Sequence, residues 1–165
     1  DTSASSLSPT GLLVYPLVRK GERLPFLDPN AEGFEVGSEN ADKLTRYAGY
    51  LEGTAYIERW IFELMHSLGA NVLGEIHTTG GGARSVVWMQ IRANVLNRGC
   101  VRPKTAECAM GAAIIAASKT AFQGLAEACR NMVSHQLKVE PQKEKAEKYE
   151  EIYHRFREEC RNRGY

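Results

Sequence analysis

Thr-Thr-Gly-Gly-Gly-Ala-Arg-Ser, residues 78–85, is the most informative segment of the sequence, because it joins a predicted strand to a predicted helix. The apolar residues in 71–78 predict a buried strand, and the pattern of residues 83–96 predicts a helix. The glycines break the strand and leave the turn without β-carbons, so a flat or bulky ligand can approach the backbone. The turn is therefore a candidate ligand site.

The chemistry of this turn suits a nucleotide, although its spacing matches neither common nucleotide motif. The start of the following helix offers unpaired N–H groups and a positive dipole end. Ser85 adds a hydroxyl one turn into the predicted helix. No lysine follows the glycines at P-loop spacing, and they do not form a G-x-G-x-x-G fingerprint. From the residues alone, a tight turn without a ligand is an equal alternative.

Upstream of the turn, the sequence predicts a leader, a short strand, a loop and a long helix. Residues 1–10 are rich in Ser and Thr and are expected to form a mobile leader. Residues 12–18 are β-like and contain Pro16, which favours a strand edge or end. Residues 20–39 carry several glycines and prolines and predict a loop that packs down on the domain. Between Asp42 and Gly69, apolar residues recur at helical spacing and predict an amphipathic helix.

Downstream, residues 99–103 predict a turn with a short extended piece, and residues 105–123 predict a helix rich in Ala and Gly. Pro141 opens a final helix whose apolar stripe covers the domain or faces a second subunit. The stripe consists of Ala146, Tyr149, Ile152, Tyr153 and Phe156. We divide the chain into the leader 1–10, an α/β core at 11–137 and a C-terminal helix at 138–165. The strands are too few for a complete sheet, which indicates that part of the domain lies upstream.

Composition excludes several classes of function and partner. The chain has 165 residues, with 21 basic and 20 acidic side chains and a net charge of +1. This balance favours neither a nucleic acid nor a membrane surface as a partner. No apolar run approaches the roughly 18 residues of a membrane span. The four histidines show no metal-ligand spacing, so no metal site is predicted.

Cysteine usage favours the cytoplasm. The four cysteines form no C-x-x-C pair and lie in apolar or helical stretches, where a reduced, buried thiol is common. They are Cys100, Cys108, Cys129 and Cys160. We expect free thiols.

The wider pattern resembles the FGGY carbohydrate kinases, in the form of their xylulokinase-like members. Residues 79–91, TGGGARSVVWMQI, resemble the family signature. Four other stretches follow in the family's order. They are residues 21–25 (GERLP) with Asp28-Pro29, residues 51–56 (LEGTAY), residues 107–113 (ECAMGAA), and Pro141 with Tyr149, Tyr153 and Phe156. The resemblance covers residues 12–156.

This resemblance implies an actin-like ATPase (ribonuclease H-like) architecture of two lobes, with ATP in the cleft between them. The chain would be the C-terminal lobe, truncated at its N-terminal side, and its partner would be the N-terminal lobe of the same polypeptide. By position, Gly80, Gly81, Gly82 and Ser85 are expected to hold the adenosine end of ATP. Gly81 should allow the closest approach, and Ser85 should lie near the adenine.

Other residues of the signature have structural interpretations. Arg84 is a candidate for nucleotide binding but equally a surface charge, and Gln90 equally a helix-packing residue. Trp88 is interpreted as a core residue rather than a base-stacking one. Family members commonly have Ala-Asp where this chain has Ala93-Asn94, which puts any salt bridge there in doubt.

The remaining motifs are interpreted in the same way. Glu22 and Arg23 are expected to form a pair that fixes a loop, because a carboxylate beside arginine makes a poor base at neutral pH. Gly53 should permit close packing of its helix. Residues 110–113 should form a small-residue surface beneath the nucleotide.

The resemblance places the first phosphate hairpin, the catalytic aspartate and most sugar contacts upstream. No catalytic residue is therefore assigned to this chain, and the Mg²⁺ ligands are expected mainly from the missing part. The intact enzyme would transfer phosphate from ATP to a ketopentose or related polyol, with D-xylulose the leading expectation, and the fragment alone would be inactive. Alternatives are a non-catalytic actin-like module with a regulatory or assembly role and an independent nucleotide-binding protein. A homodimer is also compatible with the sequence.

Overall fold

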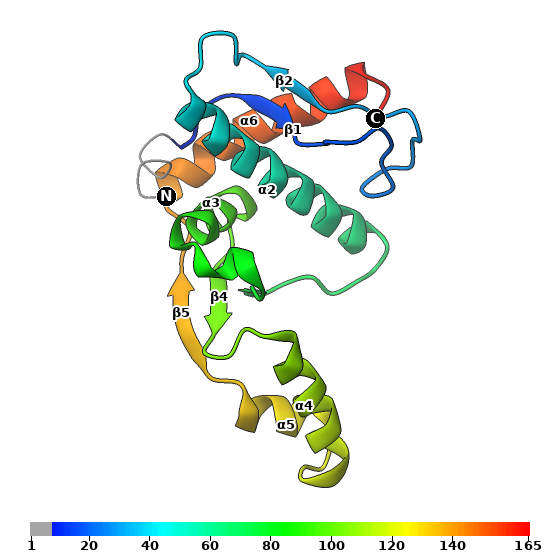
Figure 1. The fold of residues 1–165 in the computed structure, drawn as a ribbon, viewed down its shortest axis with the longest axis vertical. Helices are drawn as coiled ribbons and strands as arrows, with labels where there is room; N and C mark the ends of the chain where they lie inside the picture. The colour runs from blue at the N-terminus through cyan, green and yellow to red at the C-terminus, as the bar shows by residue number, and fades with distance from the viewer. Residues whose placement is uncertain (1–7) are drawn as a thin grey trace.

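A computed structural model describes residues 8–165 of the chain (Figure 1). Most of the predicted leader, residues 1–7, lies outside the described residues. Its last residues are packed: Ser8 is buried, and the Thr10 N–H donates to the Glu52 carboxylate at 3.0 Å. Within the described part of the leader, Thr10 thus supplies a partner for a buried carboxylate.

Two short antiparallel strands form the first sheet. Strand β1 spans Leu13–Tyr15 and pairs with β2, Phe34–Val36, so that Val14 lies opposite Glu35. Strand β2 falls inside the segment predicted to be loop. That prediction was wrong because β2 has three residues between Gly33 and Gly37, too few to show an alternating pattern.

The predicted long helix is confirmed as α2, Lys43–Ser67. Its N-cap is Asp42, whose side chain accepts a hydrogen bond from the Thr45 N–H at 2.7 Å. Helix α2 crosses β1 at very short range: a β-carbon on Gly53 would lie 2.0 Å from the Val14 carbonyl oxygen. The predicted role of Gly53 in close packing is confirmed.

The second sheet has the strand order β3-β4-β5. Strand β3 is Ile76–His77, β4 is Cys100–Pro103 and β5 is His135–Val139. Strands β3 and β4 run parallel, and β5 is antiparallel to β4. The strand predicted over residues 71–78 is thus confined to two residues. Strand β5 was not predicted, and the boundary drawn between residues 137 and 138 falls inside it.

Helices α3, Val86–Leu96, and α6, Lys143–Asn162, pack with α2 and β1 around the main core. Every residue of the predicted α6 stripe is buried, so the stripe covers this domain. The core is strongly aromatic and includes Tyr15, Phe34, Tyr56, Tyr149 and Phe156.

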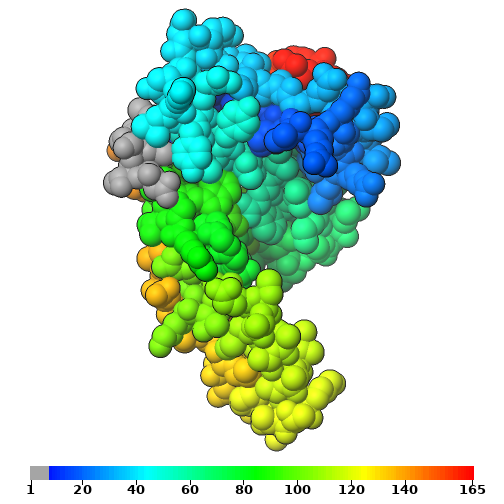
Figure 2. Space-filling model, viewed as in Figure 1, coloured from blue at the N-terminus to red at the C-terminus, as the bar shows by residue number. Residues whose placement is uncertain are grey.

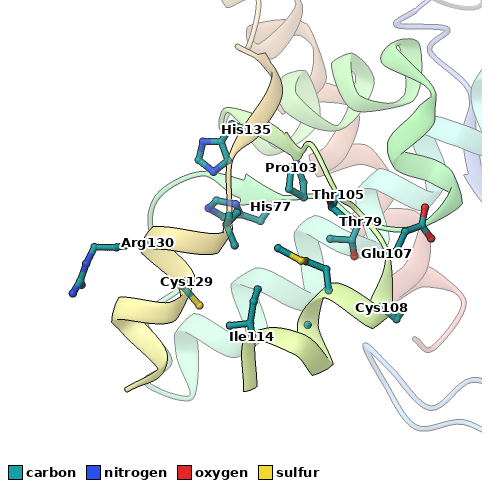
Figure 3. A pocket seen from close by; sticks show the side chains of 13 residues that line it. His77, Thr79, Pro103, Thr105, Glu107, Cys108, Ile114, Cys129, Arg130 and His135 are labelled. Carbon is teal, nitrogen blue, oxygen red and sulfur yellow. The ribbon is translucent and has the colours of Figure 1, made fainter. Parts of the chain in front are cut away.

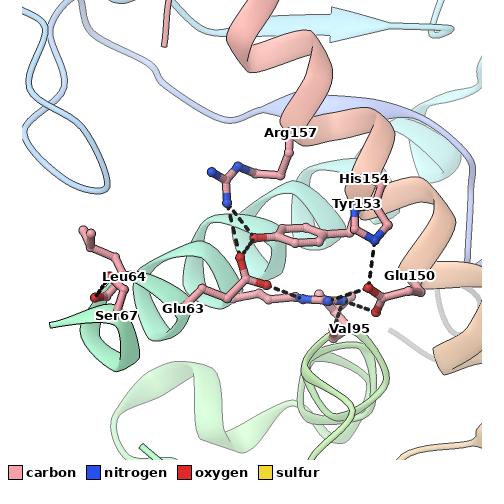
Figure 4. A network of polar contacts seen from close by, with 9 residues as sticks. Glu63, Leu64, Ser67, Val95, Glu150, Tyr153, His154 and Arg157 are labelled. Atoms are coloured by element: carbon pink, nitrogen blue, oxygen red, sulfur yellow. Dashed lines mark hydrogen bonds and ion pairs between the residues drawn. The ribbon is translucent and has the colours of Figure 1, made fainter. Parts of the chain in front are cut away.

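A polar network joins α2 to α6 at the edge of this core (Figure 4). The Arg59 guanidinium donates to Glu63, to Glu150 and to the Val95 carbonyl oxygen. The Tyr153 hydroxyl also donates to Glu63, at 2.6 Å. The network fixes α6 against α2 and, through the Val95 carbonyl oxygen, ties both to α3.

Helices α4, Cys108–Thr120, and α5, Leu125–Met132, form a hairpin that projects from the second sheet (Figures 1 and 2). The predicted helix over residues 105–123 is confirmed as α4, whereas α5 was not predicted. Helix α4 is apolar along most of its length, yet its buried residues are Ile114 and Ser118. Ile115 is 64% exposed. An apolar helix that buries so few of its residues is unusual in a complete domain.

All four cysteines are free, as predicted. Cys100 and Cys160 are buried, and burial raises the pKa of their thiols to about 11 and about 12. The prediction of burial was wrong for Cys108, which is exposed because it begins the projecting helix. In the part of the chain that the structure describes, no helix is long and apolar enough to cross a membrane.

Candidate functional site

The glycine turn lies at the carboxyl end of β3 and is open to solvent. Gly80 has a φ of 78°, a conformation that favours glycine. Its N–H donates to the Ala106 carbonyl oxygen at 3.1 Å, which ties the turn to the loop before α4. A β-carbon on Gly80 or Gly81 would meet no heavy atom within 4 Å. The backbone at these two glycines is therefore accessible to a flat ligand.

Gly82 serves a different purpose from its two neighbours. A β-carbon there would lie 3.1 Å from Nε1 of Trp88, so the turn packs directly on the indole. Trp88 is partly buried and belongs to the rim of the main core. Its interpretation as a packing residue is confirmed.

Ser85 is not one turn into the helix, as the sequence predicted. Residues Gly81–Arg84 form a 3₁₀ turn, and Ser85 is the N-cap of α3. Its Oγ accepts a hydrogen bond from the Trp88 N–H at 3.2 Å. The prediction failed because the 3₁₀ turn takes the place that the first helical turn was expected to fill. The Ser85 hydroxyl keeps its own hydrogen as a donor.

Two arginines border the turn. The Arg102 guanidinium donates to the Ala83 carbonyl oxygen at 2.9 Å and so supports the turn from β4. Arg84 is 80% exposed and lies 3.6 Å from Glu107, which places it as a surface charge.

Gln90 and Asn94 link α3 to the segment before α6. The Gln90 amide donates to the Asn94 side-chain oxygen and to the Glu140 carbonyl oxygen. Asn94 is buried, and its side-chain oxygen accepts the Gln142 N–H at 2.7 Å. Gln90 is thus a packing residue, and Asn94 is held by neutral hydrogen bonds rather than by a salt bridge.

A cavity of about 710 Å³ lies beside the turn, between the sheet and the α4–α5 hairpin (Figure 3). It is lined by His77, Thr79, Pro103, Thr105, Glu107, Cys108, Met110, Gly111, Ile114, Cys129, Arg130, Val133 and His135. Most of these side chains are apolar or uncharged. Such a cavity suits the apolar surface of a small organic ligand.

The predicted site residues reach this cavity only in part. Gly80, Gly81, Gly82 and Ser85 do not line it, but the neighbouring Thr79 does. Of the predicted small-residue surface, Met110 and Gly111 line the cavity, so this surface faces the region beside the turn.

One wall of the cavity was missed from the sequence. His77 and His135 lie with their rings 5.3 Å apart, and Cys129 faces the cavity from α5, whereas Arg130 points away from it (Figure 3). His135 and Cys129 belong to β5 and α5, two elements that the sequence did not reveal. Only the folded arrangement of α5 and β5 brings these residues to the cavity beside the turn.

The loop motif at Glu22 is held differently from the prediction. The Tyr15 hydroxyl donates to Glu22 at 2.9 Å, and the Arg23 N–H donates to the same carboxylate at 2.8 Å. Within residues 8–165, no ion pair joins the Glu22 and Arg23 side chains. Glu22 therefore fixes the loop through Tyr15 and through backbone, because the Arg23 side chain is exposed.

No metal-binding cluster is found among residues 8–165: no three His, Cys, Asp or Glu side chains are placed to hold an ion. The chemistry that this region offers is an open glycine backbone, the Ser85 hydroxyl, whose hydrogen is available as a donor, and an adjoining apolar cavity. These features suit the base and ribose of a nucleotide better than its triphosphate.

Comparison with known proteins gives a consistent match. Residues 1–120 match the model of the FGGY family of carbohydrate kinases, C-terminal domain. The xylulose kinase of Staphylococcus xylosus is 28% identical over 161 residues, which cover 95% of this chain and 33% of that protein. The glycerol kinase of Herminiimonas arsenicoxydans is 30% identical, covering 93% of this chain and 31% of that protein.

Solved structures share the fold. The ligand-bound xylulose kinase from Lactobacillus acidophilus superposes with a TM-score of 0.79 at 24% identity, covering 98% of this chain and 33% of that one. The chain spans about a third of the length of the curated relatives that it matches.

Proposed function

Because the chain belongs to the FGGY family of carbohydrate kinases, we propose that it is the nucleotide-binding part of an ATP-dependent sugar kinase. The family resemblance found in the sequence is confirmed, and so is the α/β fold of the C-terminal lobe. The observation that carries the proposal is the exposed turn at Gly80 and Gly81, which no side chain covers and which adjoins the 710 Å³ cavity.

The adenosine end of ATP would lie over this turn. Gly80 and Gly81 would admit it to the backbone, and Gly82 would keep the turn seated on Trp88. The Ser85 oxygen is engaged by the helix, so its hydroxyl hydrogen would be donated to the base or ribose. Thr79 and Met110 would meet the same ligand from the side of the cavity.

The rest of the chemistry would come from the remaining part of the polypeptide. Phosphoryl transfer requires phosphate contacts, Mg²⁺ ligands and a base for the sugar hydroxyl. From the family resemblance, the Mg²⁺ ligands and the catalytic base would lie in the N-terminal part of the polypeptide. Closure of two lobes would exclude water from the γ-phosphate. On this proposal, the 165-residue chain alone turns nothing over.

A ketopentose is the proposed substrate class, with D-xylulose first. The support is the similarity to proteins named xylulose kinase, which stand beside others named glycerol kinase and gluconokinase. The free cysteines favour a reducing compartment, so we place the enzyme in the cytoplasm.

The test is a coupled assay of ADP release by the full-length gene product against ketopentoses, aldonates and polyols. The substitution Gly81→Val places a branched side chain over the turn and should raise the KM for ATP at least about tenfold, because the base would be displaced. Ala126→Val, at an exposed position on α5, is the matched control and should leave the KM unchanged. Sugar-dependent release that Gly81→Val does not affect would refute the assigned nucleotide site. No release with any sugar would favour a lobe kept for binding alone.

A further inference from the structure

A partly buried ion pair joins α3 to α2 beside the segment that leads into the glycine turn; the side chains of Arg92 and Glu58 are 10% and 24% exposed. Arg92 lies on α3, and its Nε donates to the Glu58 carboxylate of α2 at 2.7 Å. A second guanidinium nitrogen donates to the other oxygen of the same carboxylate, so the pair is bidentate. The planar guanidinium is therefore held in one orientation between two helices.

The third guanidinium nitrogen holds Thr78, the residue that follows β3 and leads into the turn. Arg92 Nη1 donates to the Thr78 hydroxyl at 2.8 Å, and this bond is buried. The Thr78 N–H donates to the Val101 carbonyl oxygen at 2.8 Å. Thr78 is thus fixed through its side chain by α3 and through its backbone by β4. The open glycines begin two residues later, at Gly80.

The other end of the turn rests on the same cluster. The Arg92 guanidinium lies over the Trp88 ring, 5.7 Å from its centroid. Trp88 in turn packs closely under Gly82, where a β-carbon would lie 3.1 Å from the indole nitrogen. Arg92 therefore contacts a support at each end of the turn.

A contribution to folding stability does not by itself explain why an ion pair occupies this site. Removing two charges from water costs free energy, and well-packed apolar side chains often serve a buried site at least as well as an ion pair. An apolar pair, however, could not donate a hydrogen bond to the Thr78 hydroxyl. What the Arg92–Glu58 pair provides, and an apolar pair would not, is a fixed position for the Thr78 side chain.

We propose that Arg92 and Glu58 are positioning residues for the nucleotide: they act through the Thr78 hydroxyl to hold the turn open at Gly80 and Gly81. The inference rests on the proposed nucleotide site and adds to it a buried network that the ligand does not touch. Loss of the network should weaken MgATP binding while the fold persists.

The experiment measures the dissociation constant of MgATP and the thermal unfolding midpoint of the full-length gene product. Thr78→Val keeps the shape of the side chain and removes the hydroxyl, and we expect about fivefold to tenfold weaker binding, because a misplaced binding group lowers affinity and rate. Thr78→Ser restores the hydroxyl and should bind as the wild type does. The double variant Glu58→Leu with Arg92→Leu should remain folded and bind as weakly as Thr78→Val.

Arg59→Gln is the matched control. Arg59, on α2, is like Arg92 a largely buried arginine with carboxylate partners. Its guanidinium also donates to the Val95 carbonyl oxygen of α3, but it makes no hydrogen bond to Thr78. The substitution should lower the unfolding midpoint and leave nucleotide affinity unchanged. Equal losses of affinity in Arg59→Gln and in the double variant would show a general structural effect and overturn the inference.

The remaining outcomes separate the inference from the proposed function. If Gly81→Val abolishes binding but Thr78→Val and the double variant bind as the wild type does, the positioning network is refuted and the site stands. If the wild type binds no nucleotide, both fall.

Discussion

Among single residues, two glycines of α2 allow the effect of close packing on stability to be distinguished from the effect of helix propensity. A β-carbon on Gly53 would lie 2.0 Å from the Val14 backbone oxygen. One on Gly49 would meet only side-chain atoms, the end of Leu12 at 3.0 Å and a methyl group of Val14 at 3.3 Å. Gly53→Ala should therefore cost about 3 kcal/mol or more, the upper range for overpacking. Gly49→Ala should change stability by less than about 1 kcal/mol, because alanine favours the helix by a similar amount.

Urea unfolding of the two variants would measure this difference. Equal midpoints for Gly53→Ala and Gly49→Ala would show that α2 and β1 are less closely packed than the structure indicates.

A buried carboxylate gives the fold a pH dependence. Burial raises the pKa of Glu52, against the hydrogen bonds that Thr10 and Tyr149 donate to it. The folded state thus binds the Glu52 proton more tightly than the unfolded state does. The stability that this proton contributes is fully present below pH 4.5, the ordinary value, and is lost as pH rises through the folded value.

Relative to Glu52→Gln, the wild type should therefore lose stability as pH rises from 4.5 towards neutrality. Glu35 is a control of opposite sign, because the Arg46 guanidinium lowers its pKa to about 2. The contribution of Glu35 is present above pH 4.5 and is lost as pH falls towards 2. Both trends would be tested by comparing the unfolding midpoints of Glu52→Gln and Glu35→Gln with that of the wild type from about pH 2 to neutrality. A difference between Glu52→Gln and wild type that does not change with pH would contradict the first.

At the scale of elements, long periodic segments were predictable and short ones were not. The apolar spacing of α2 and α6 defined both helices and their buried faces, because each repeats over several turns. Strands β2 and β3 have three and two residues, so their pairing depends on distant partners that a local pattern does not contain. Strand β5 is mostly exposed and mixes polar with apolar residues, so its sequence showed no pattern that predicted a strand.

The candidate site shows the same division. The open backbone at Gly80 and Gly81 was predictable, because consecutive glycines carry no side chain that could cover it. The 3₁₀ turn that makes Ser85 an N-cap was not, since a capping serine and a serine in the first turn give similar sequences. The contact between Arg92 and Thr78 joins α3 to the segment after β3, across 14 residues of sequence, and only the fold brings them together.

For the molecule as a whole, the projecting α4–α5 hairpin and the edge strand β3 indicate a surface that another part of a protein normally covers. Helix α4 leaves Ile115 64% exposed although its sequence is apolar. Within the described residues, β3 pairs with β4 alone and keeps a free edge. Apolar helices and free strand edges are normally covered in a folded protein. Because the relatives are about three times as long as this chain, we expect another part of the full-length polypeptide to cover both.

Hydrogen exchange of the full-length gene product, compared with that of the 165-residue chain, would test this expectation. Amides of α4 and β3 should exchange at least about tenfold more slowly in the longer protein, since opening the covered surface would cost an added free energy. Amides of α6 are the internal control and should exchange alike in both, because the α6 stripe is already buried against α2 and β1. Equal exchange of α4 in the two proteins would mean that the hairpin stays exposed in the whole molecule, and a partner outside the polypeptide would then have to account for its apolar face.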